Sequence, residues 1–186
     1  MRIIGGAFRG RRLASVGRGD AAAHLRPTSD RVRESLFNVL ANAHADRLDD
    51  ARVLDLFAGT GALGLEAVSR GAAHVTFVEN GRTAQKLLRE NIRLCSAEDM
   101  TQTLPRDARK PGPAPAPVTL VVLDPPYGKG IGEQALAAAI AQGWIAHDAL
   151  IVWEESADIT PPYGLTQIDE RRYGDTFIRL LEYTQP

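Results

Sequence analysis

The strongest constraint on the fold is an alternation of strand-like and helix-like segments that begins at residue 52. The expected strands are 52–57, 74–79, 100–104, 119–124 and 149–155, and the expected helices are 61–71, 82–94 and 132–143. Strands that alternate with helices favour a mostly parallel sheet covered on both faces. Sheets of this kind bind ligands beyond the carboxyl ends of their strands, so functional residues are expected there.

Segments on both sides of this alternation complete an α/β domain. A helix is expected from about residue 30 to 43, because apolar residues follow a capping run at helical spacing: Val32, Leu36, Val39, Leu40 and Ala43. The tail 165–183 reads as two strands around a turn. Five prolines between residues 105 and 118 exclude a helix from that loop. We expect a basic N-terminal hairpin and arm over residues 1–25 and the α/β domain over residues 26–186.

Charge is distributed unevenly along the chain. Residues 1–33 hold eight arginines and two aspartates, for a net charge of +6, whereas the remainder carries −7. A basic arm on an acidic body favours a polyanionic partner such as nucleic acid. The alternative is an ordinary solvated surface, since 19 of the 22 basic residues of the chain are arginine.

Composition disfavours several classes of protein. The single cysteine, Cys95, has no partner for an internal disulfide, which favours a reducing compartment, and we expect the cytoplasm. The longest apolar runs are far too short to cross a bilayer, so no membrane partner is expected. The arginine-rich start resembles a transit peptide only superficially, because its isoleucines and phenylalanine suit strands. No metal is expected, since the histidines show no ligand spacing: His24, His44, His74 and His147.

The stretch "DLFAGTGALG" places three glycines between a strand and a helix. Their pattern, G-x-G-x-x-G, allows a tight turn and close approach of backbone N–H groups to a nucleotide: Gly59, Gly61 and Gly64. Glu79 ends the next strand, where a carboxylate can accept both hydroxyls of a ribose. Asp55 would repel a phosphate and attract an ammonium group, which favours S-adenosylmethionine over NAD. The alternatives are a purely structural glycine turn and an ordinary exposed acid at the strand end.

The stretch "VVLDPPYGKG" ends the expected fourth strand with an unusual order of residues. Asp124 and the carbonyl of Pro125 are hydrogen-bond acceptors, and neither Pro125 nor Pro126 has an N–H to donate. Tyr127 offers a flat face on which a base can stack. Two fixed acceptors beside a stacking ring suit a planar ligand with an exocyclic amine. The structural alternative is a rigid turn with a half-buried tyrosine.

These motifs resemble those of a known family. "DPPY" after a strand, together with "DLFAGTG", is similar to amino-methyltransferases that use S-adenosylmethionine. A wider resemblance, over nearly the whole chain, is to the bacterial 16S rRNA guanine-N2 methyltransferase family of RsmD type, and it rests on "RIIGGAFRGRRL", "LRPTSDRVRESLFNVL", "VLDLFAGTGALGLEAVSRGA" and "RRYGDTFIRLLEY". It implies a Rossmann-like class I methyltransferase fold: a mostly parallel seven-stranded sheet with an antiparallel last strand, and a short N-terminal hairpin. It also implies a monomer that methylates one guanine on the assembled small ribosomal subunit without a metal.

The resemblance further implies roles for individual residues. The cofactor S-adenosylmethionine would be held by Asp55, Phe57, Gly59, Gly61, Glu79, Asn80, Asp107 and Ala108. The target guanine would be held at the catalytic turn by Asp124, Pro125, Pro126 and Tyr127. The family usually continues after its "DA" pair with a helix, which the prolines after Asp107 forbid here. Asp99 is therefore the alternative reader of the adenine amine.

The expected reaction is an in-line displacement, in which the guanine amine attacks the sulfonium methyl group. The target base would have to leave its stack to reach the pocket. Arginines would hold the RNA backbone: Arg2, Arg9, Arg11, Arg12, Arg26 and Arg31. Three alternatives remain open: a methyltransferase for adenine N6 in RNA or DNA, a nicotinamide-dependent oxidoreductase built on the glycine-rich loop, and non-catalytic RNA binding.

Overall fold

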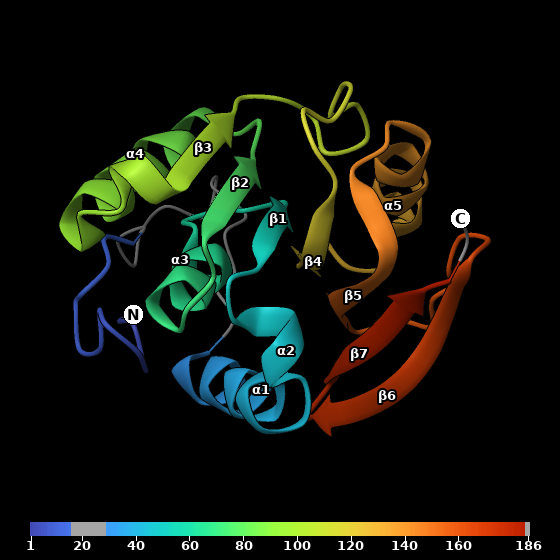
Figure 1. Cartoon of the computed structure of the whole chain (residues 1–186), viewed down its shortest axis with the longest axis horizontal. Helices are drawn as coiled ribbons and strands as arrows, with labels where there is room; N and C mark the ends of the chain where they lie inside the picture. The colour runs from blue at the N-terminus through green and yellow to red at the C-terminus, as the bar shows by residue number, and fades with distance from the viewer. Residues whose placement is uncertain (16–28, 185–186) are drawn as a thin grey trace.

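The structure, a computed structural model that describes residues 1–15 and 29–184, has a seven-stranded sheet at its centre (Figure 1). The strands are β1 (Arg52–Leu56), β2 (His74–Val78), β3 (Thr101–Leu104), β4 (Val118–Leu123), β5 (Ile145–Glu155), β6 (Leu165–Tyr173) and β7 (Thr176–Tyr183). Their order across the sheet is β3-β2-β1-β4-β5-β7-β6. The first five strands pair in parallel, and β7 is antiparallel to both of its neighbours. The expected mostly parallel sheet with an antiparallel last strand is confirmed.

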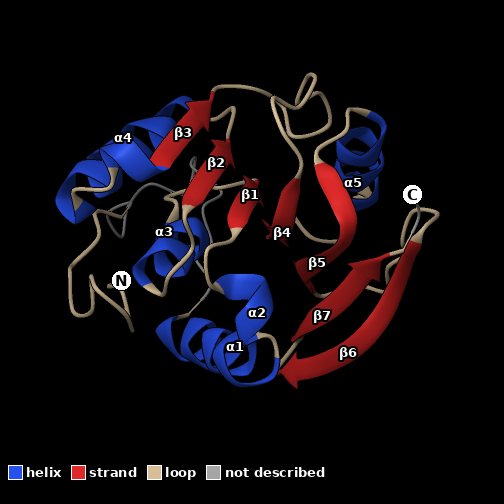
Figure 2. Cartoon of the chain, viewed as in Figure 1, coloured by secondary structure: helices blue, strands red, loops and turns tan. Residues whose placement is uncertain are grey.

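Helices cover both faces of the sheet (Figure 2). They are α1 (Asp30–Ala43), α2 (Ala45–Leu48), α3 (Ala62–Ser69), α4 (Arg82–Cys95) and α5 (Ile131–Ala141), and the 3-10 turn η2 (Glu98–Met100) precedes β3. The helix expected over residues 30 to 43 matches α1, whose N-cap Ser29 accepts a hydrogen bond from the N–H of Val32. No helix within residues 1–15 and 29–184 has the length and apolarity needed to span a membrane.

The central strands are apolar on both sides because two separate cores pack against them. Leu120 and Val122 of β4 belong to the core that α1, α3 and α4 cover, whereas Val121 and Leu123 belong to the core beneath α5. Side chains alternate between the faces of a strand, so a strand buried on both faces needs an unbroken apolar run. This explains why "TLVVL" carried the clearest strand signal in the sequence.

β5 begins four residues earlier than the sequence indicates, at Ile145 rather than Ala149. The pairing of β4 with β5 shifts register over this part. His147 and Asp148 are exposed there, and Asp148 has a positive φ of 61°. Two exposed polar residues in an irregular stretch break the apolar pattern, which is why the sequence placed the strand start too late.

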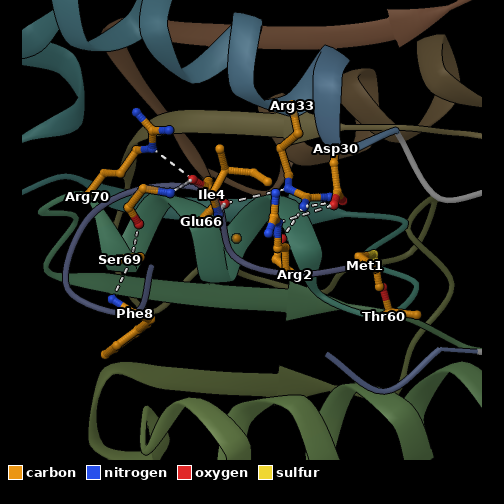
Figure 3. Close-up of polar contacts among 12 residues, drawn as sticks. Met1, Arg2, Ile4, Phe8, Asp30, Arg33, Thr60, Glu66, Ser69 and Arg70 are labelled. Carbon is orange, nitrogen blue, oxygen red and sulfur yellow. Dashed lines mark hydrogen bonds and ion pairs between the residues drawn. The ribbon is translucent and has the colours of Figure 1, made fainter. Parts of the chain in front are cut away.

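The N-terminal segment reverses direction and packs against α3 (Figure 3). Arg2 and Arg12 form a single antiparallel bridge, so the expected hairpin is a short reversal without regular strands. Glu66 of α3 is fully buried, and its two carboxylate oxygens accept the N–H groups of Ile4 and Gly5, each at 2.8 Å. These hydrogen bonds fix the basic segment to a residue of the domain that lies about 60 positions later in the chain.

Candidate active site

A cavity of about 210 Å³ lies beyond the carboxyl ends of β1, β2 and β3. Its lining consists of Phe57, Val78, Glu79, Asn80, Arg106, Asp107, Ala108, Arg109, Pro126 and Ile131. Five residues expected to bind the cofactor therefore meet there with one residue of the expected catalytic turn. β1 and β4 are adjacent in the sheet, and the strands that follow them lie to opposite sides. The cavity thus sits at a topological switch point, where open α/β sheets bind ligands.

The glycine-rich loop after β1 needs its glycines for space and for backbone conformation. Gly61 has a φ of 79°, and a Cβ there would lie 2.4 Å from Cδ1 of Leu88. A Cβ on Gly64 would lie 2.4 Å from Cε1 of Phe77, so the helix could not approach β2 so closely. Phe57 lines the cavity with a φ of 63°, a conformation that costs a non-glycine residue about 1–2 kcal/mol. Strain of this kind is characteristic of functional loops.

Glu79 joins the loop after β1 to the loop after β2. Its Oε2 accepts the N–H of Gly59 at 2.8 Å, and its Oε1 accepts the N–H of Gly81 at 2.6 Å. A carboxylate offers about four lone-pair sites, so each oxygen can accept one further hydrogen bond. Because Glu79 also lines the cavity, this remaining capacity faces the place where a ligand would lie.

Asp55 lies beside the cavity but outside its described lining. The side chain is 2% exposed, and its Oδ2 accepts the N–H of Gly64 at 2.9 Å. Burial raises the pKa of this carboxyl to about 8, the Gly64 hydrogen bond opposes that rise, and the charge of Glu79 adds to it. The sequence places Asp55 correctly at the strand end, and the structure turns its carboxyl toward α3.

Asp107 and its alternative, Asp99, lie at opposite ends of β3. Asp107 follows the carboxyl end and lines the cavity, whereas Asp99 belongs to η2 before the strand begins. The guanidinium of Arg109 binds the Asp107 carboxylate, with 2.6 Å between Nη2 and Oδ2, and holds the pKa of that carboxyl below its usual range. Residues 105–117, all of them described, form no helix, as the prolines require. The geometry therefore favours Asp107 over Asp99 as a cavity residue.

The Asp124–Tyr127 turn follows β4 directly and is tied to β5. The hydroxyl of Tyr127 donates to Oε1 of Glu154 at 2.9 Å, and the N–H of Gly128 donates to Oε1 of Glu155 at 3.2 Å. Burial raises the pKa of Tyr127, and the negative charges of Asp124 and Glu154 raise it further. The phenol therefore stays protonated and acts as a donor, which fixes the orientation of its ring.

Glu154 and Glu155 are site residues that the sequence alone did not identify. They end β5 with only 7% and 4% exposure, and the sequence indicates only that they belong to a strand. The register pairs Leu123 with Trp153, so these last two residues of β5 lie at the level where Asp124 and the next residue follow β4. Two acids at the end of a buried apolar strand, next to the strand that carries Asp124, were a signal that could have identified them.

The expected RNA-binding arginines are exposed where the structure describes them, whereas Arg26 lies outside the described residues. The exposed ones are Arg2, Arg9, Arg11, Arg12 and Arg31. Arg11 donates to the carbonyl of Leu94 at 2.6 Å, so part of its guanidinium is already bound. Among residues 1–15 and 29–184, no group of His, Cys, Asp and Glu side chains is arranged to hold a metal ion.

Known proteins resemble this chain over most of its length. The family model described as "Conserved hypothetical protein 95" matches residues 1–182. Ribosomal RNA small subunit methyltransferase D of Escherichia coli strain K12 is 39% identical over 158 residues, covering 85% of this chain and 76% of that protein. The protein of the same name from Haemophilus influenzae is 35% identical over 189 residues, covering 98% of this chain and 93% of that protein.

Solved structures resemble it in fold as well. The structure of yhhF from Escherichia coli has a TM-score of 0.85 at 37% identity and covers 100% of this chain and 99% of that chain. An RNA methyltransferase from Salinibacter ruber, solved in complex with S-adenosyl-L-homocysteine, has a TM-score of 0.67 and covers 86% of this chain and 95% of that chain. At 14% identity this second likeness shows the fold alone. The fold is thus that of the Rossmann-like methyltransferases.

Proposed function

The chain belongs to the conserved hypothetical protein 95 family, which includes the ribosomal RNA small subunit methyltransferase D proteins, and on that premise we propose that it transfers a methyl group from S-adenosylmethionine to the exocyclic N2 of a guanine in 16S rRNA. One observation carries the proposal. Pro126, from the turn that suits an aromatic amine, forms part of the wall of the cavity that suits a nucleoside. A methyl donor bound in the cavity and an amine bound at the turn would therefore both lie next to Pro126.

The cavity residues fit the nucleoside end of the cofactor. Glu79 has spare acceptor capacity for ribose hydroxyls, and Asp107 can accept from the adenine amine. Phe57 and Ala108 give the cavity apolar surface for the adenine ring. The volume of 210 Å³ lies below the range of about 300–1,000 Å³ usual for whole ligands, which suits this part of the cofactor alone. The methionine end would extend toward Gly59, Gly61 and Asp55.

S-adenosylmethionine would supply an electrophilic methyl group, and the turn after β4 would prepare the nucleophile. The lone pair of the guanine amine is delocalised into the ring, so the amine is a weak nucleophile. Acceptors at Asp124 and the Pro125 carbonyl would bind the amine hydrogens and favour localisation of that lone pair. After transfer, the nitrogen would carry a positive charge and release one proton, which Asp124 would accept.

Tyr127 would stack on the target base, and Glu154 would hold the tyrosine ring in place. The hydrogen bond from the Tyr127 hydroxyl to Glu154 fixes one edge of the ring, and Glu155 anchors the backbone at Gly128. A base reaches such a site only after it leaves its stack. The exposed arginines of the N-terminal reversal would bind the RNA backbone around it. We propose the assembled small subunit as the substrate and a cytoplasmic monomer as the active form.

Transfer to adenine N6 is the second candidate, because the Asp124–Tyr127 turn suits any planar ring with an exocyclic amine. The deciding experiment is mass mapping of methylated bases in 16S rRNA from cells with and without this protein. The proposal expects one N2-methylguanine to disappear with the protein. A lost N6-methyladenine would identify the second candidate, and an unchanged rRNA would contradict both. Calorimetry with S-adenosylhomocysteine and with NAD tests the cofactor: binding of NAD alone would instead support an oxidoreductase.

A further inference from the structure

A second and larger hollow, of about 500 Å³, lies between the outer face of α1 and β6. We name it the α1–β6 groove, and its lining consists of Arg31, Glu34, Ser35, Asn38, Val39, Asn42, Ala43 and Arg171. It shares no residue with the cavity at β1–β3. In Figure 1 the carboxyl end of β6 lies next to the α1–α2 region.

The α1–β6 groove connects to the expected catalytic turn through one β-hairpin. Oγ of Ser35, in the groove, lies 2.6 Å from the hydroxyl of Tyr173 at the end of β6. Tyr173 pairs with Thr176 across the turn between β6 and β7. The Thr176 side chain in turn lies near enough to the Tyr127 hydroxyl to lower the pKa of Tyr127, against the rise that burial causes. A strand that lies in the groove would therefore run beside the residue that would stack on the target base.

The chemistry of the groove suits a ribose-phosphate strand. Arg31 and Arg171 lie at its walls, and Ser35, Asn38 and Asn42 add neutral donors and acceptors. RNA backbones are held by this combination of cations, amides and hydroxyls. Glu34 lowers the net charge of the lining to +1, and Asp169 pairs with Arg171, with 3.0 Å between Oδ2 and Nε. The neutral polar groups must therefore share the contacts with the two arginines. Val39 and Ala43 are the two apolar residues of the lining, which otherwise consists of polar and charged side chains.

The groove also continues the basic surface of the N-terminal segment. Arg2 lies 4.0 Å from the Asp30 carboxylate at the start of α1, and Arg33 binds the same carboxylate from the buried side (Figure 3). Arg31 is the next residue after Asp30 and is exposed. Exposed arginines therefore extend from Arg2 to Arg31 and on to Arg171, with the carboxylates of Asp30, Glu34 and Asp169 among them.

We propose that the α1–β6 groove binds the ribose-phosphate strand of the RNA that flanks the target nucleotide. This proposal rests on the proposed function, since it assigns the groove to the same RNA substrate. It adds Arg171, Asn38 and Asn42 to the RNA-contacting residues, and it gives the strand a path from the N-terminal segment to Tyr127.

The test compares two matched double variants, Arg31→Gln with Arg171→Gln in the groove, and Arg52→Gln with Arg89→Gln elsewhere. Arg52 and Arg89 are exposed on β1 and α4, so the control pair removes the same charge outside the groove. Methylation of isolated small ribosomal subunits that lack the modification is measured at increasing salt. Binding of a fluorescent 16S rRNA fragment and of S-adenosylhomocysteine is measured in parallel.

The groove variant is expected to raise KM about tenfold and to leave kcat and S-adenosylhomocysteine affinity unchanged. The slope of log affinity against log salt should fall by about 0.7 for each phosphate of a single strand that the variant no longer binds, whereas the control pair should leave that slope unchanged. Equal behaviour of the two double variants would overturn the proposal. A defect on assembled subunits combined with normal binding of protein-free rRNA would assign the groove to a ribosomal protein instead, which also overturns it. Groove-dependent RNA binding without any methylation would leave the groove standing and contradict the proposed function.

Discussion

The two ends of the candidate site use carboxylates in different ways. At the β1–β2 end, the carboxylates accept backbone N–H groups of glycines: Asp55 binds Gly64 in α3, and Glu79 binds Gly59 and Gly81 in the loops after β1 and β2. At the β4–β5 end, Glu154 accepts the hydroxyl of Tyr127, a side chain from the neighbouring strand connection. The first end is therefore organised by contacts of carboxylates with the backbone, whereas the second adds a contact between side chains of separate segments to its backbone contact, Gly128–Glu155.

This difference predicts how the two ends respond to substitution. A carboxylate that binds backbone N–H groups shapes the loop itself, so its replacement should change cofactor affinity and local stability together. A carboxylate that orients one side chain can be changed while the backbone stays in place, so its replacement should change turnover more than affinity. Substitutions at each end should therefore show either separate effects on affinity and turnover, or the same effects if the two ends act together.

The largest effect on stability is expected from Asp55→Asn. The pKa of Asp55 is raised to about 8, so between pH 5 and 8 the folded protein binds more protons at this group than the unfolded chain. Wild-type stability should therefore fall as pH rises through this window, by at most about 1.4 kcal/mol per pH unit, whereas the asparagine variant lacks this contribution. Denaturant unfolding of both proteins from pH 5 to 8 measures the difference, and parallel pH profiles would contradict it.

A proton should also leave Asp55 when the cofactor binds. An ammonium group placed near this carboxyl would favour its charged form and lower its pKa. Calorimetry in buffers of different ionisation enthalpy should therefore show proton release for the wild type at pH 7. The same heats in all buffers would contradict the placement of the methionine end beside Asp55.

The next largest effect is expected from Tyr127→Ala at the β4–β5 end. Loss of a stacking ring should lower kcat/KM for the small subunit by about 100-fold while S-adenosylhomocysteine affinity stays unchanged. Tyr127→Phe keeps the ring and Glu154→Gln keeps an acceptor for its hydroxyl, so each should lower kcat by about tenfold or less. A phenylalanine variant as impaired as the alanine variant would show that the hydroxyl, and not the ring, is what matters.

Glu79→Gln should have a smaller effect, confined to the β1–β2 end. The amide has one acceptor oxygen where the carboxylate used two, so either Gly59 or Gly81 loses its partner. Affinity for S-adenosylhomocysteine should fall about tenfold, and kcat at saturating cofactor should change little. Glu90→Gln, at an exposed position of α4, is the matched control. Equal affinities of the two variants would remove Glu79 from the cofactor site.

The smallest effect is expected from Arg109→Ala. Arg109 binds the Asp107 carboxylate at the surface of the cavity, so its removal frees that group to accept from an adenine amine. Affinity for S-adenosylhomocysteine should rise by about threefold, the size expected for a partly exposed ion pair. A loss of affinity, measured by calorimetry, would show that Arg109 itself contacts the cofactor.

The features that the sequence could predict depend on local segments, and the features that it could not predict depend on contacts between distant segments. The sheet, α1 and the glycine-rich loop follow from local patterns, and the Glu79–Gly59 contact spans only 20 residues. The role of Glu154 was not predicted from the sequence, because its partner Tyr127 lies 27 residues away. Nothing in "ALIVWEE" shows which acid turns toward the site. The α1–β6 groove could not be predicted from the sequence, because its Ser35–Tyr173 contact joins residues 138 positions apart. Local pattern therefore predicts the elements, and only the fold shows which distant side chains meet.

The most direct test of the account is the single-turnover rate of Asp124→Ala with saturating S-adenosylmethionine and unmethylated small subunits. Asp124 is expected to bind the target amine and to take no part in holding the cofactor. The rate should fall by about 1,000-fold, while S-adenosylhomocysteine affinity stays within about twofold of the wild type. A rate near that of the wild type would contradict the assignment of methyl transfer to the turn after β4.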